Sequence, residues 1–268
     1  MKLIKKLALL FISGDNHFLR IFLLKYGWFG NYTNWKIAKN KSSGYDNQII
    51  IEKVKKATLA VKNNEAVYER DGCLFYEENY NWNLVGILLN IGLENSSILN
   101  ILDFGGSLGS SYFQNKKMLS SINKIEWSII EQSNFVEVGI KYLKDEQLDF
   151  FESYDDFIKA KGKPKIVLFS SVLQYLENPY QIINFYLSQK IEYIYIDLNN
   201  FIDKRPDQIT IQVVPPQIYN ASYPSWFFNK INFVEFFLNL GYEKISEWRN
   251  EEEINYGYHG GLIFRLIK

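Results

Sequence analysis

Strand-like and helix-like segments alternate over the second half of this 268-residue chain, and this alternation constrains the fold more than any other feature. Apolar segments with the length and composition of buried strands cover residues 97–104, 124–131, 148–153, 165–171 and 192–198. Segments of helical character lie between them, around 109–120, 133–144, 154–161 and 178–190. Strands joined by helices pair in parallel and are covered on both faces, so the pattern predicts a doubly wound α/β domain.

The chain on either side of this region completes the predicted organisation. A helix over 229–241 and a hairpin of strands at 242–248 and 261–267 are expected to close a seven-stranded Rossmann-like sheet within a domain spanning 96–268. The proline- and aromatic-rich residues 199–228 are expected to form a lid-like insertion. Residues 1–95 are expected to form an N-terminal helical extension, with helices over 46–64 and 82–94 and a structured loop over 26–46.

Composition excludes several classes of function. Lys plus Arg and Asp plus Glu both number 30, so the chain lacks the basic excess that a nucleic-acid partner normally selects. Cys73 is the single cysteine, which rules out an intramolecular disulfide and a thiolate metal cluster. With only His17 and His259 as histidines, no metal site is expected.

The N-terminal residues 1–25 combine a basic start with a short apolar run. The run is shorter than the roughly 18 residues of a membrane span, and no small-residue cleavage site follows it, so we expect a cytoplasmic protein. Residues 2–29 have the pattern of an amphipathic helix. Two interpretations stay open: the helix packs on its own domain, or residues 1–25 make weak peripheral contact with the inner face of a membrane.

A glycine-rich loop follows the first of the five strands, in the sequence ILDFGGSLGSS of residues 101–111. Asp103 closes the strand, and glycines within 105–109 leave room for a ligand to approach the backbone. Glu131 closes the next strand, where a carboxylate can accept hydrogen bonds from both hydroxyls of a ribose. The order of these residues favours a nucleotide-like ligand over a loop that is glycine-rich only for close packing.

The order D-F-G-G-S-L-G lacks the G-x-G-x-x-G spacing of a dinucleotide fold. With Glu131 downstream, it resembles the first two motifs of class I S-adenosylmethionine (SAM) methyltransferases, and KIVLFSSVLQYLENPY (165–180) resembles their fourth strand and following turn. More narrowly, GNYTNWKIA, the glycine loop, SSVLQYLENPY and VPPQIYNASYPSWFF resemble a family of methyltransferases encoded among bacterial surface-polysaccharide genes. That second resemblance covers nearly the whole chain.

The resemblance implies SAM as cofactor and a set of residues that contact it. These are Asp103, Gly105, Gly106, Ser107, Gly109, Glu131, Gln132, Ser153, Tyr154, Ser170 and Ser171. It further implies methyl transfer to a sugar or to a glycolipid-linked glycan intermediate. The alternatives left open are a small-molecule or protein methyltransferase, and a SAM-binding module without transfer activity.

Two positions depart from the family pattern. Ser107 replaces the middle glycine of the loop, and Gln174-Tyr175 replaces a Glu-His pair, so no catalytic histidine is carried over from that motif. Methyl transfer to a hydroxyl needs a general base. Side chains expected near the carboxyl edge of the sheet are therefore candidates for catalysis or acceptor binding: Asp197, Tyr219, Tyr223, Trp226 and His259. The catalytic candidates are Asp197, Tyr223 and His259. We expect His259 to lie in a loop just before the last strand.

Overall fold

The computed structural model describes residues 25–44, 47–94, 98–252 and 254–268. The predicted contact of residues 1–25 with a membrane falls almost entirely outside these residues. The amphipathic helix predicted over 2–29 is wrong at its end, because the chain from Gly27 forms strand β1 (Gly27–Tyr32). No helix within the described residues has the length and apolar character needed to cross a membrane.

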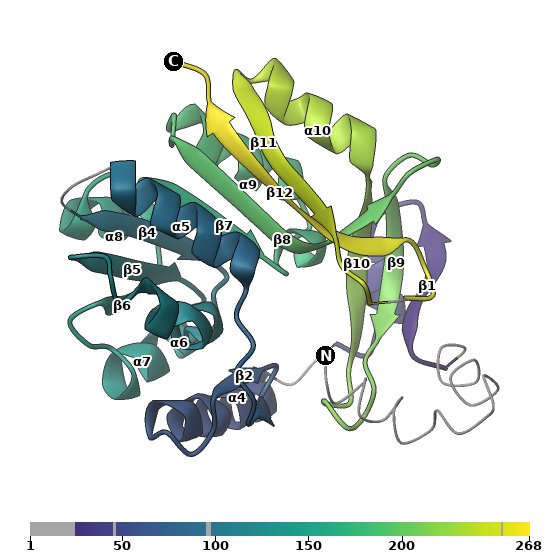
Figure 1. The fold of residues 1–268 in the computed structure, drawn as a ribbon. Helices are drawn as coiled ribbons and strands as arrows, with labels where there is room; N and C mark the ends of the chain where they lie inside the picture. The colour runs from purple at the N-terminus through teal and green to yellow at the C-terminus, as the bar shows by residue number, and fades with distance from the viewer. Residues whose placement is uncertain (1–24, 45–46, 95–97, 253) are drawn as a thin grey trace.

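A ten-stranded mixed sheet forms the centre of the structure (Figure 1). All seven predicted strands belong to it: β4 (Leu99–Phe104), β5 (Ile125–Ile130), β6 (Leu148–Phe151), β7 (Ile166–Ser170), β8 (Tyr193–Ile202), β11 (Tyr242–Arg249) and β12 (Tyr258–Leu266). They lie in the order β6-β5-β4-β7-β8-β12-β11, and the first five pair in parallel. The carboxyl ends of these parallel strands therefore meet at one edge of the sheet.

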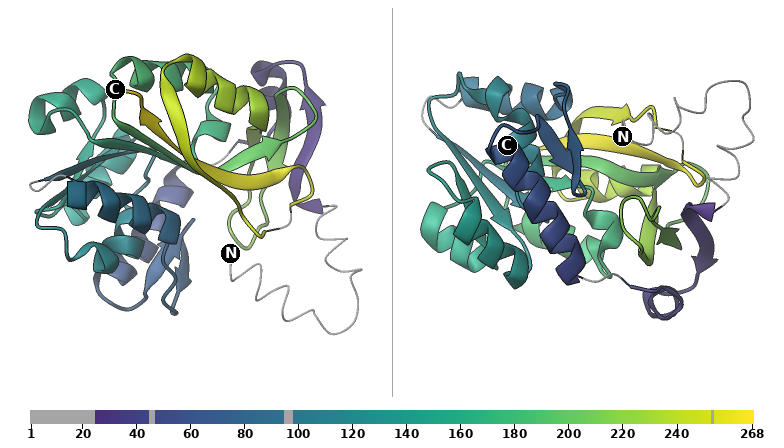
Figure 2. Two further views of the ribbon diagram at one scale, coloured as in Figure 1. Left: turned by 45° about the horizontal axis from the view of Figure 1, so that its top comes forward. Right: turned by 90° about the horizontal axis from the view of Figure 1, so that it is seen from below.

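Three further strands extend the sheet, so the predicted number of seven is wrong. They are β1, β9 (Gln208–Val213) and β10 (Ser222–Asn229). β9 pairs antiparallel with β1 and with β10, and the end of β10 pairs in parallel with the end of β8. Figures 1 and 2 show β1 side by side with the green strands β9 and β10, although it comes from the start of the described chain. The predicted lid-like insertion over 199–228 is thus largely strand, and its irregular parts are reduced to residues 203–207 and 214–221.

Helices cover both faces of the sheet, which confirms the predicted α/β architecture. One hydrophobic core lies under α4 (Asn47–Lys62), α5 (Trp82–Glu94), α6 (Ser110–Asn115) and α7 (Ser133–Tyr142). The opposite core lies under α8 (Tyr154–Lys161), α9 (Pro179–Ser188) and α10 (Lys230–Asn239). Short 3-10 turns, η1 (Lys116–Leu119) and η2 (Leu173–Tyr175), follow α6 and β7.

The N-terminal region contains strands in addition to the helices and irregular segments predicted for it. α4 and α5 confirm its two helices, and their apolar faces share one core with β4 and β5. The predicted loop over 26–46 is instead β1 and the helix α3 (Trp35–Lys41), whose Ala38 packs against Ile209 and Ile211 of β9. A hairpin of β2 (Tyr68–Arg70) and β3 (Cys73–Phe75) follows α4. The division at residue 95 stays a prediction.

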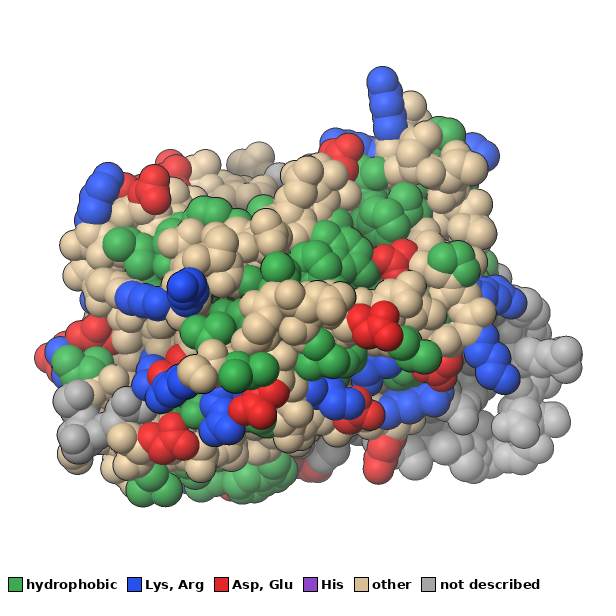
Figure 3. Space-filling view, turned by 90° about the horizontal axis from the view of Figure 1, so that it is seen from above, with side chains coloured by type: hydrophobic (Ala, Val, Ile, Leu, Met, Phe, Trp, Pro, Cys, Tyr) green, Lys and Arg blue, Asp and Glu red, His purple; other side chains and the backbone are tan. Residues whose placement is uncertain are grey.

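Positive and negative side chains are mixed on the surface face seen in Figure 3. On the face seen in Figure 3, Lys and Arg side chains are interspersed with Asp and Glu and do not gather into one basic patch. The ion pairs that the structure contains include Lys124–Glu126, Lys165–Glu192 and Arg265–Glu243. A face of this kind matches the balanced composition of the chain.

Candidate active site

Three of the six non-glycine residues with positive φ in the described chain lie at the carboxyl edge of three neighbouring strands. Ser107 after β4, Ser171 after β7 and Leu198 within β8 have φ values of 55°, 53° and 50°. The left-handed region costs a residue with a side chain about 1–2 kcal/mol. Such strain persists only where the surrounding structure enforces it, and it clusters at functional sites. The edge formed by β4, β7 and β8 is therefore the first place to look for one.

The glycines of the loop are required by their surroundings. A Cβ on Gly105, whose φ is +71°, would lie 2.4 Å from Cγ2 of Val172. A Cβ on Gly106 would lie 2.5 Å from the carboxyl carbon of Asp103. Gly109 (φ +94°) begins α6. Close packing thus accounts for part of the glycine content, and it holds the loop down against the strand ends.

Asp103 is buried beneath this loop, and only one of its two carboxyl oxygens accepts a hydrogen bond from a described residue. Its exposure is 0%, and Oδ2 accepts a hydrogen bond of 3.2 Å from the indole nitrogen of Trp127. Oδ1 has no hydrogen-bond partner among the described residues. Burial raises the pKa of Asp103 to about 7, and the charge of Glu131 adds to the rise. A buried acceptor without a partner lowers the stability of the folded state. This oxygen is therefore suited to a ligand that brings a hydrogen-bond donor or a positive charge.

Glu131 reaches from the end of β5 to the glycine loop. Its carboxylate accepts hydrogen bonds from the backbone nitrogens of Ser107 (3.3 Å) and Gln132 (2.9 Å). Burial raises its pKa, and these two hydrogen bonds oppose the rise. The structure therefore brings the predicted ribose acceptor into contact with the predicted loop.

Two further predicted cofactor contacts, Ser170 and Ser171, lie at the same edge. Ser170 is the last residue of β7 and pairs with Asp197 of β8. The hydroxyl of Ser171 lies 3.4 Å from the side-chain nitrogen of Gln174, which also donates to the carbonyl of Leu198 at 3.0 Å. Gln174 is fully buried, so it ties the turn after β7 to the strained turn in β8.

The remaining three predicted cofactor contacts have local structural roles. Ser153 caps α8, accepting a hydrogen bond from the backbone nitrogen of Asp156 at 3.2 Å. The ring of Tyr154 packs edge-on against Phe185 and Tyr186. Gln132 is exposed at the start of α7. Their predicted contact with a cofactor stays a prediction.

Asp197, a predicted catalytic residue, is held by several donors. The side-chain nitrogen of Asn81 (2.7 Å), the indole nitrogen of Trp248 (3.1 Å) and the backbone nitrogen of Leu198 (2.8 Å) all donate to its carboxylate. Burial raises its pKa, while these bonds and the charge of Arg70 oppose the rise. The Asn81 side chain also accepts from the Tyr195 hydroxyl at 3.1 Å. Asp197 thus fixes the segment before α5 onto the sheet edge.

His259 lies in β12 rather than in a loop, which corrects the predicted position. The apolar run GLIFRLI begins the strand by pattern, but pairing with β8 extends it back to Tyr258. His259 stands opposite Asn200, and its ring meets that of Trp28 edge-on at 5.2 Å. Burial lowers its pKa to about 4, and Nδ1 has no hydrogen-bond partner among the residues described. The imidazole is therefore neutral at pH 7.

The predicted aromatic residues fall into two groups. Tyr223 joins a tyrosine cluster: its hydroxyl lies 3.3 Å from that of Tyr219, and its ring meets Tyr175 edge-on at 5.3 Å. Trp226 lies on the other face of β10, where it stacks on Trp35 at 6.1 Å. Tyr175 continues directly from the β7 turn, so the tyrosine cluster adjoins the strained edge.

Sequence reasoning missed the polar residues of the β2–β3 hairpin. Glu69 is 1% exposed and accepts hydrogen bonds from the hydroxyl of Ser110 and, at 3.1 Å, from the backbone nitrogen of Gly72. Burial raises its pKa to about 7. Arg70 donates to the side chain of Gln114 at 3.3 Å. The Asp71-Gly72 pair is a hairpin-turn signal that could have revealed this element, though not its docking on α6.

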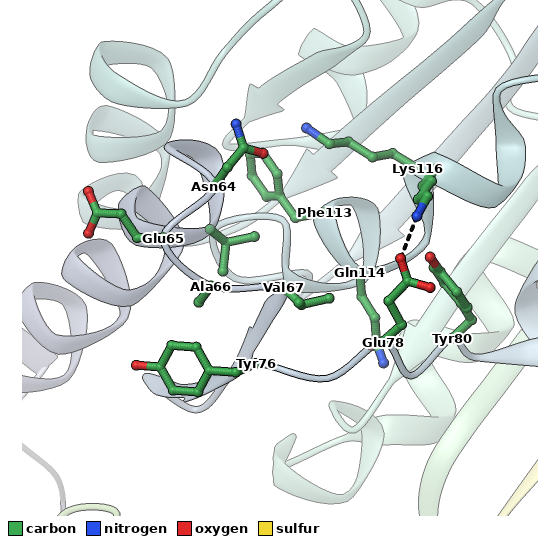
Figure 4. A pocket seen from close by; sticks show the side chains of 12 residues that line it. Asn64, Glu65, Ala66, Val67, Tyr76, Glu78, Tyr80, Phe113, Gln114 and Lys116 are labelled. Atoms are coloured by element: carbon green, nitrogen blue, oxygen red, sulfur yellow. Dashed lines mark hydrogen bonds and ion pairs between the residues drawn. The ribbon is translucent and has the colours of Figure 1, made fainter.

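A surface pocket of about 410 Å³ lies between the end of α4, the segments that flank the hairpin and α6 (Figure 4). Tyr76, Tyr80 and Phe113 line it together with the ion pair between Glu78 and Lys117. None of the predicted site residues lines this pocket. In the part of the chain that the structure describes, no group of three or more His, Cys, Asp or Glu side chains is placed to hold a metal ion.

Comparison with known proteins places the chain among distant structural relatives. No family model matches it, and no curated protein matches its sequence. Solved structures do match. Magnesium protoporphyrin IX methyltransferase (ChlM) from Synechocystis PCC 6803 with bound SAM is 12% identical over 84% of this chain and 99% of its own, with a TM-score of 0.48.

Two other matches are similarly distant. The N-terminal domain of EvdMO1, in the presence of S-adenosylhomocysteine (SAH) and D-fucose, is 11% identical over 84% of this chain and 98% of its own, with a TM-score of 0.46. An S-adenosylmethionine-dependent methyltransferase from Clostridium acetobutylicum ATCC 824 is 7% identical over 69% of this chain and 91% of its own, with a TM-score of 0.45. Relatives this distant say nothing of the reaction or the acceptor of this chain.

Proposed function

We propose that this chain binds SAM at the carboxyl edge of β4 and β5 and transfers its methyl group. The observation that carries the proposal is the joined arrangement of Asp103, the glycine loop and Glu131 on two adjacent strands. The residues fit the cofactor chemically. Oδ1 of Asp103 is a buried acceptor without a partner among the described residues, and SAM carries positive charge. Glu131 is an acceptor suited to the ribose diol.

The residues of the chain would act mainly by alignment. SAM supplies a methyl group on a positively charged sulfur, which makes that methyl reactive toward an aligned nucleophile. Glu131 would hold the ribose, and Asp103 would fix the loop and face the charged end of the cofactor. If the acceptor is a hydroxyl, a general base must take its proton. Asp197 and His259 remain the candidates for that role, and His259 is neutral at pH 7 because of its low pKa. Tyr223 keeps its own proton, so its proposed part in catalysis is to position the acceptor.

The acceptor we propose is a sugar or a glycolipid-linked glycan intermediate of surface-polysaccharide synthesis. This part of the proposal rests on the sequence resemblance of residues 30–38, 170–180 and 214–228 to that family. The reaction would take place in the cytoplasm, where SAM is made, with residues 1–25 offering a route to the inner face of the membrane. A small-molecule or protein acceptor, or cofactor binding without transfer, are the outcomes that the experiments must separate.

Titration calorimetry with SAH and, separately, with NADH tests the cofactor. We expect SAH to bind, and Glu131→Ala to weaken it by about 1–3 kcal/mol because charged hydrogen bonds are lost. Glu126→Ala is the matched control, since Glu126 lies on the same strand at the opposite edge and pairs with Lys124. Binding of NADH without SAH would overturn the proposal.

A turnover assay then separates an enzyme from a binding module. Tritiated methyl groups of SAM should appear in cell-envelope glycan fractions incubated with the wild-type chain. Label in protein or in small metabolites instead would redirect the acceptor class. SAH binding with no transfer to any fraction would leave a binding module.

A further inference from the structure

One face of the β1–β9–β10 extension is built from uncharged polar and aromatic side chains, and we call it the uncharged face. Cross-strand partners share a face of a sheet. The pairs Tyr223–Gln212, Ser225–Thr210, Trp28–Gln212 and His259–Asn200 therefore lie together, because the face continues onto the ends of β8 and β12. Its polar and aromatic members are Trp28, Asn200, Gln208, Thr210, Gln212, Tyr223, Ser225, Phe227 and His259.

Charge is absent from the parts of the strands that form this face, and Asp197 of β8 and Arg265 of β12 lie beyond those parts. Residues 27–32, 198–202, 208–213, 222–229 and 258–260 contain no Asp, Glu, Lys or Arg, although these types make up 22% of the chain. The one titratable group in the physiological range, His259, has a pKa lowered to about 4 by burial. Burial accounts for this along most of the face, because Asn200, Thr210 and Ser225 are fully buried. The absence of charge extends to Gln212 and Tyr223, which are partly exposed.

Hydrogen bonds run along the face but leave acceptors unused. Ser225 accepts from the side-chain nitrogen of Asn200 at 2.9 Å and from the indole nitrogen of Trp28 at 3.3 Å. The side-chain oxygen of Asn200 and Nδ1 of His259 are buried without a hydrogen-bond partner among the described residues. The face thus offers neutral acceptors and donors, and it cannot neutralise an anion or a cation.

The face opens beside the strained edge of the sheet. Its partly exposed members are Gln212 and Tyr223, and two more tyrosines join them: Tyr175 donates to the side-chain oxygen of Gln212 at 2.8 Å, and Tyr219 meets Tyr223. We call these four residues the open end. Tyr175 lies four positions after Ser171, so the open end is next to the proposed cofactor edge.

The electrostatics of the open end disfavour a negatively charged ligand. Burial first, and then nearby charges that include Asp71, raise the pKa of Tyr175 and of Tyr223, so both hydroxyls stay neutral. The amine of Lys53 at the rim is engaged by the carbonyls of Ile218 and, at 3.5 Å, Gln217. Neutral amides and hydroxyls combined with aromatic rings suit a ring that carries hydroxyl groups and apolar C–H faces.

We propose that the open end of the uncharged face is the acceptor subsite, and that the unit it binds is an uncharged, hydroxyl-rich ring without carboxylate or phosphate. This proposal rests on the proposed function, and it adds where the acceptor binds and that the bound unit is uncharged. A sugar acid would bring an anion to four side chains that carry no charge, where Asp71 opposes it and the amine of Lys53 is held by backbone carbonyls. We therefore expect a preference for the neutral sugar of at least about tenfold, equivalent to about 1.4 kcal/mol.

Saturation-transfer NMR and titration with matched glycoside pairs test this on the full chain saturated with SAH. The probes are methyl glucoside and methyl galactoside, each against its uronic acid counterpart, which differs only in carrying a carboxylate. Gln212→Lys should abolish or reverse the preference, because it places a cation at the open end. Gln181→Lys, an identical change at an exposed position of α9, should leave the preference unchanged.

The outcomes are distinct. Equal or tighter binding of the uronic acids by the wild-type chain, failure of both neutral glycosides to bind, or equal effects of the two lysine variants would each overturn the subsite. Tyr223→Phe keeps the ring and removes the hydroxyl, so it should weaken glycoside binding severalfold while SAH binding holds. Loss of SAH binding in the wild-type chain would instead contradict the proposed function itself.

Discussion

Asp103→Asn should make the protein more stable at high pH, because the native state tolerates the ionised form of Asp103 poorly. The side chain is 0% exposed, and its one hydrogen-bond partner among the described residues is the Trp127 indole, to which an asparagine oxygen can also serve as acceptor. Burial raises the pKa of Asp103 from its ordinary value of 3.8 to about 7. The substitution keeps the shape of the group beneath Gly106 and removes the charge.

The sign and size follow from proton linkage. Because the folded pKa is above the unfolded one, the native state binds the proton more tightly, and stability is lost as the pH rises from about 4 through about 7. Each pKa unit corresponds to about 1.36 kcal/mol, so the full shift sets a ceiling of about 4 kcal/mol. The gap in unfolding free energy between Asp103→Asn and wild type should widen over this window in favour of the variant.

Urea unfolding of both proteins at a series of pH values measures that gap. The pKa of Glu69 is also raised to about 7 and contributes in the same direction, but Glu69 is present in both proteins and cancels in the difference. A gap that stays constant from about pH 4 to about pH 8 would refute the reasoning. It would mean that Asp103 is ionised at little cost within the native loop.

Three further predictions follow from the loop, the insertion and the N-terminus. Gly106→Ala should lower the unfolding free energy by about 1–3 kcal/mol through overpacking against Asp103. Gly86→Ala in α5, whose added Cβ would meet nothing within 4 Å, should be neutral or stabilising, and similar values for both variants would contradict the loop geometry. Amide exchange in residues 214–221 should be faster than in β9 and β10 without ligands and should slow once SAH and a neutral glycoside are bound; equal protection in both states would show that this segment is no lid. Removing residues 1–25 should abolish any salt-sensitive flotation with anionic liposomes, and unchanged flotation would exclude a membrane role for this segment.

The five parallel strands were predictable because buried strands and their helices carry strong local patterns. Residues 99–104 read as an apolar run that ends in Asp103 and glycines, and the structure places the strand and the loop where this pattern predicts them. The proximity of Glu131 to the loop also follows from parallel topology, because neighbouring strand ends share one edge.

The extension was missed because its strands are defined by tertiary pairing. β9 does alternate polar residues with Ile209, Ile211 and Val213, but it is short and stands among prolines, so an irregular insertion was the simpler interpretation. β1 gains its strand conformation from β9, about 180 residues away along the chain. Glu69 escaped notice for a similar reason, since its burial depends on docking of the hairpin against Ser110.

The central claim, that SAM binds over the glycine loop, is tested most directly by the glycine amide signals of the protein. With glycine alone labelled with ¹⁵N, titration with SAH should shift the signals of Gly105, Gly106 and Gly109. Gly86 in α5 and Gly162 after α8, both away from the loop, should serve as unshifted references. If SAH leaves the three loop signals unmoved while NADH shifts them, or if neither compound moves them, the proposed cofactor site is wrong.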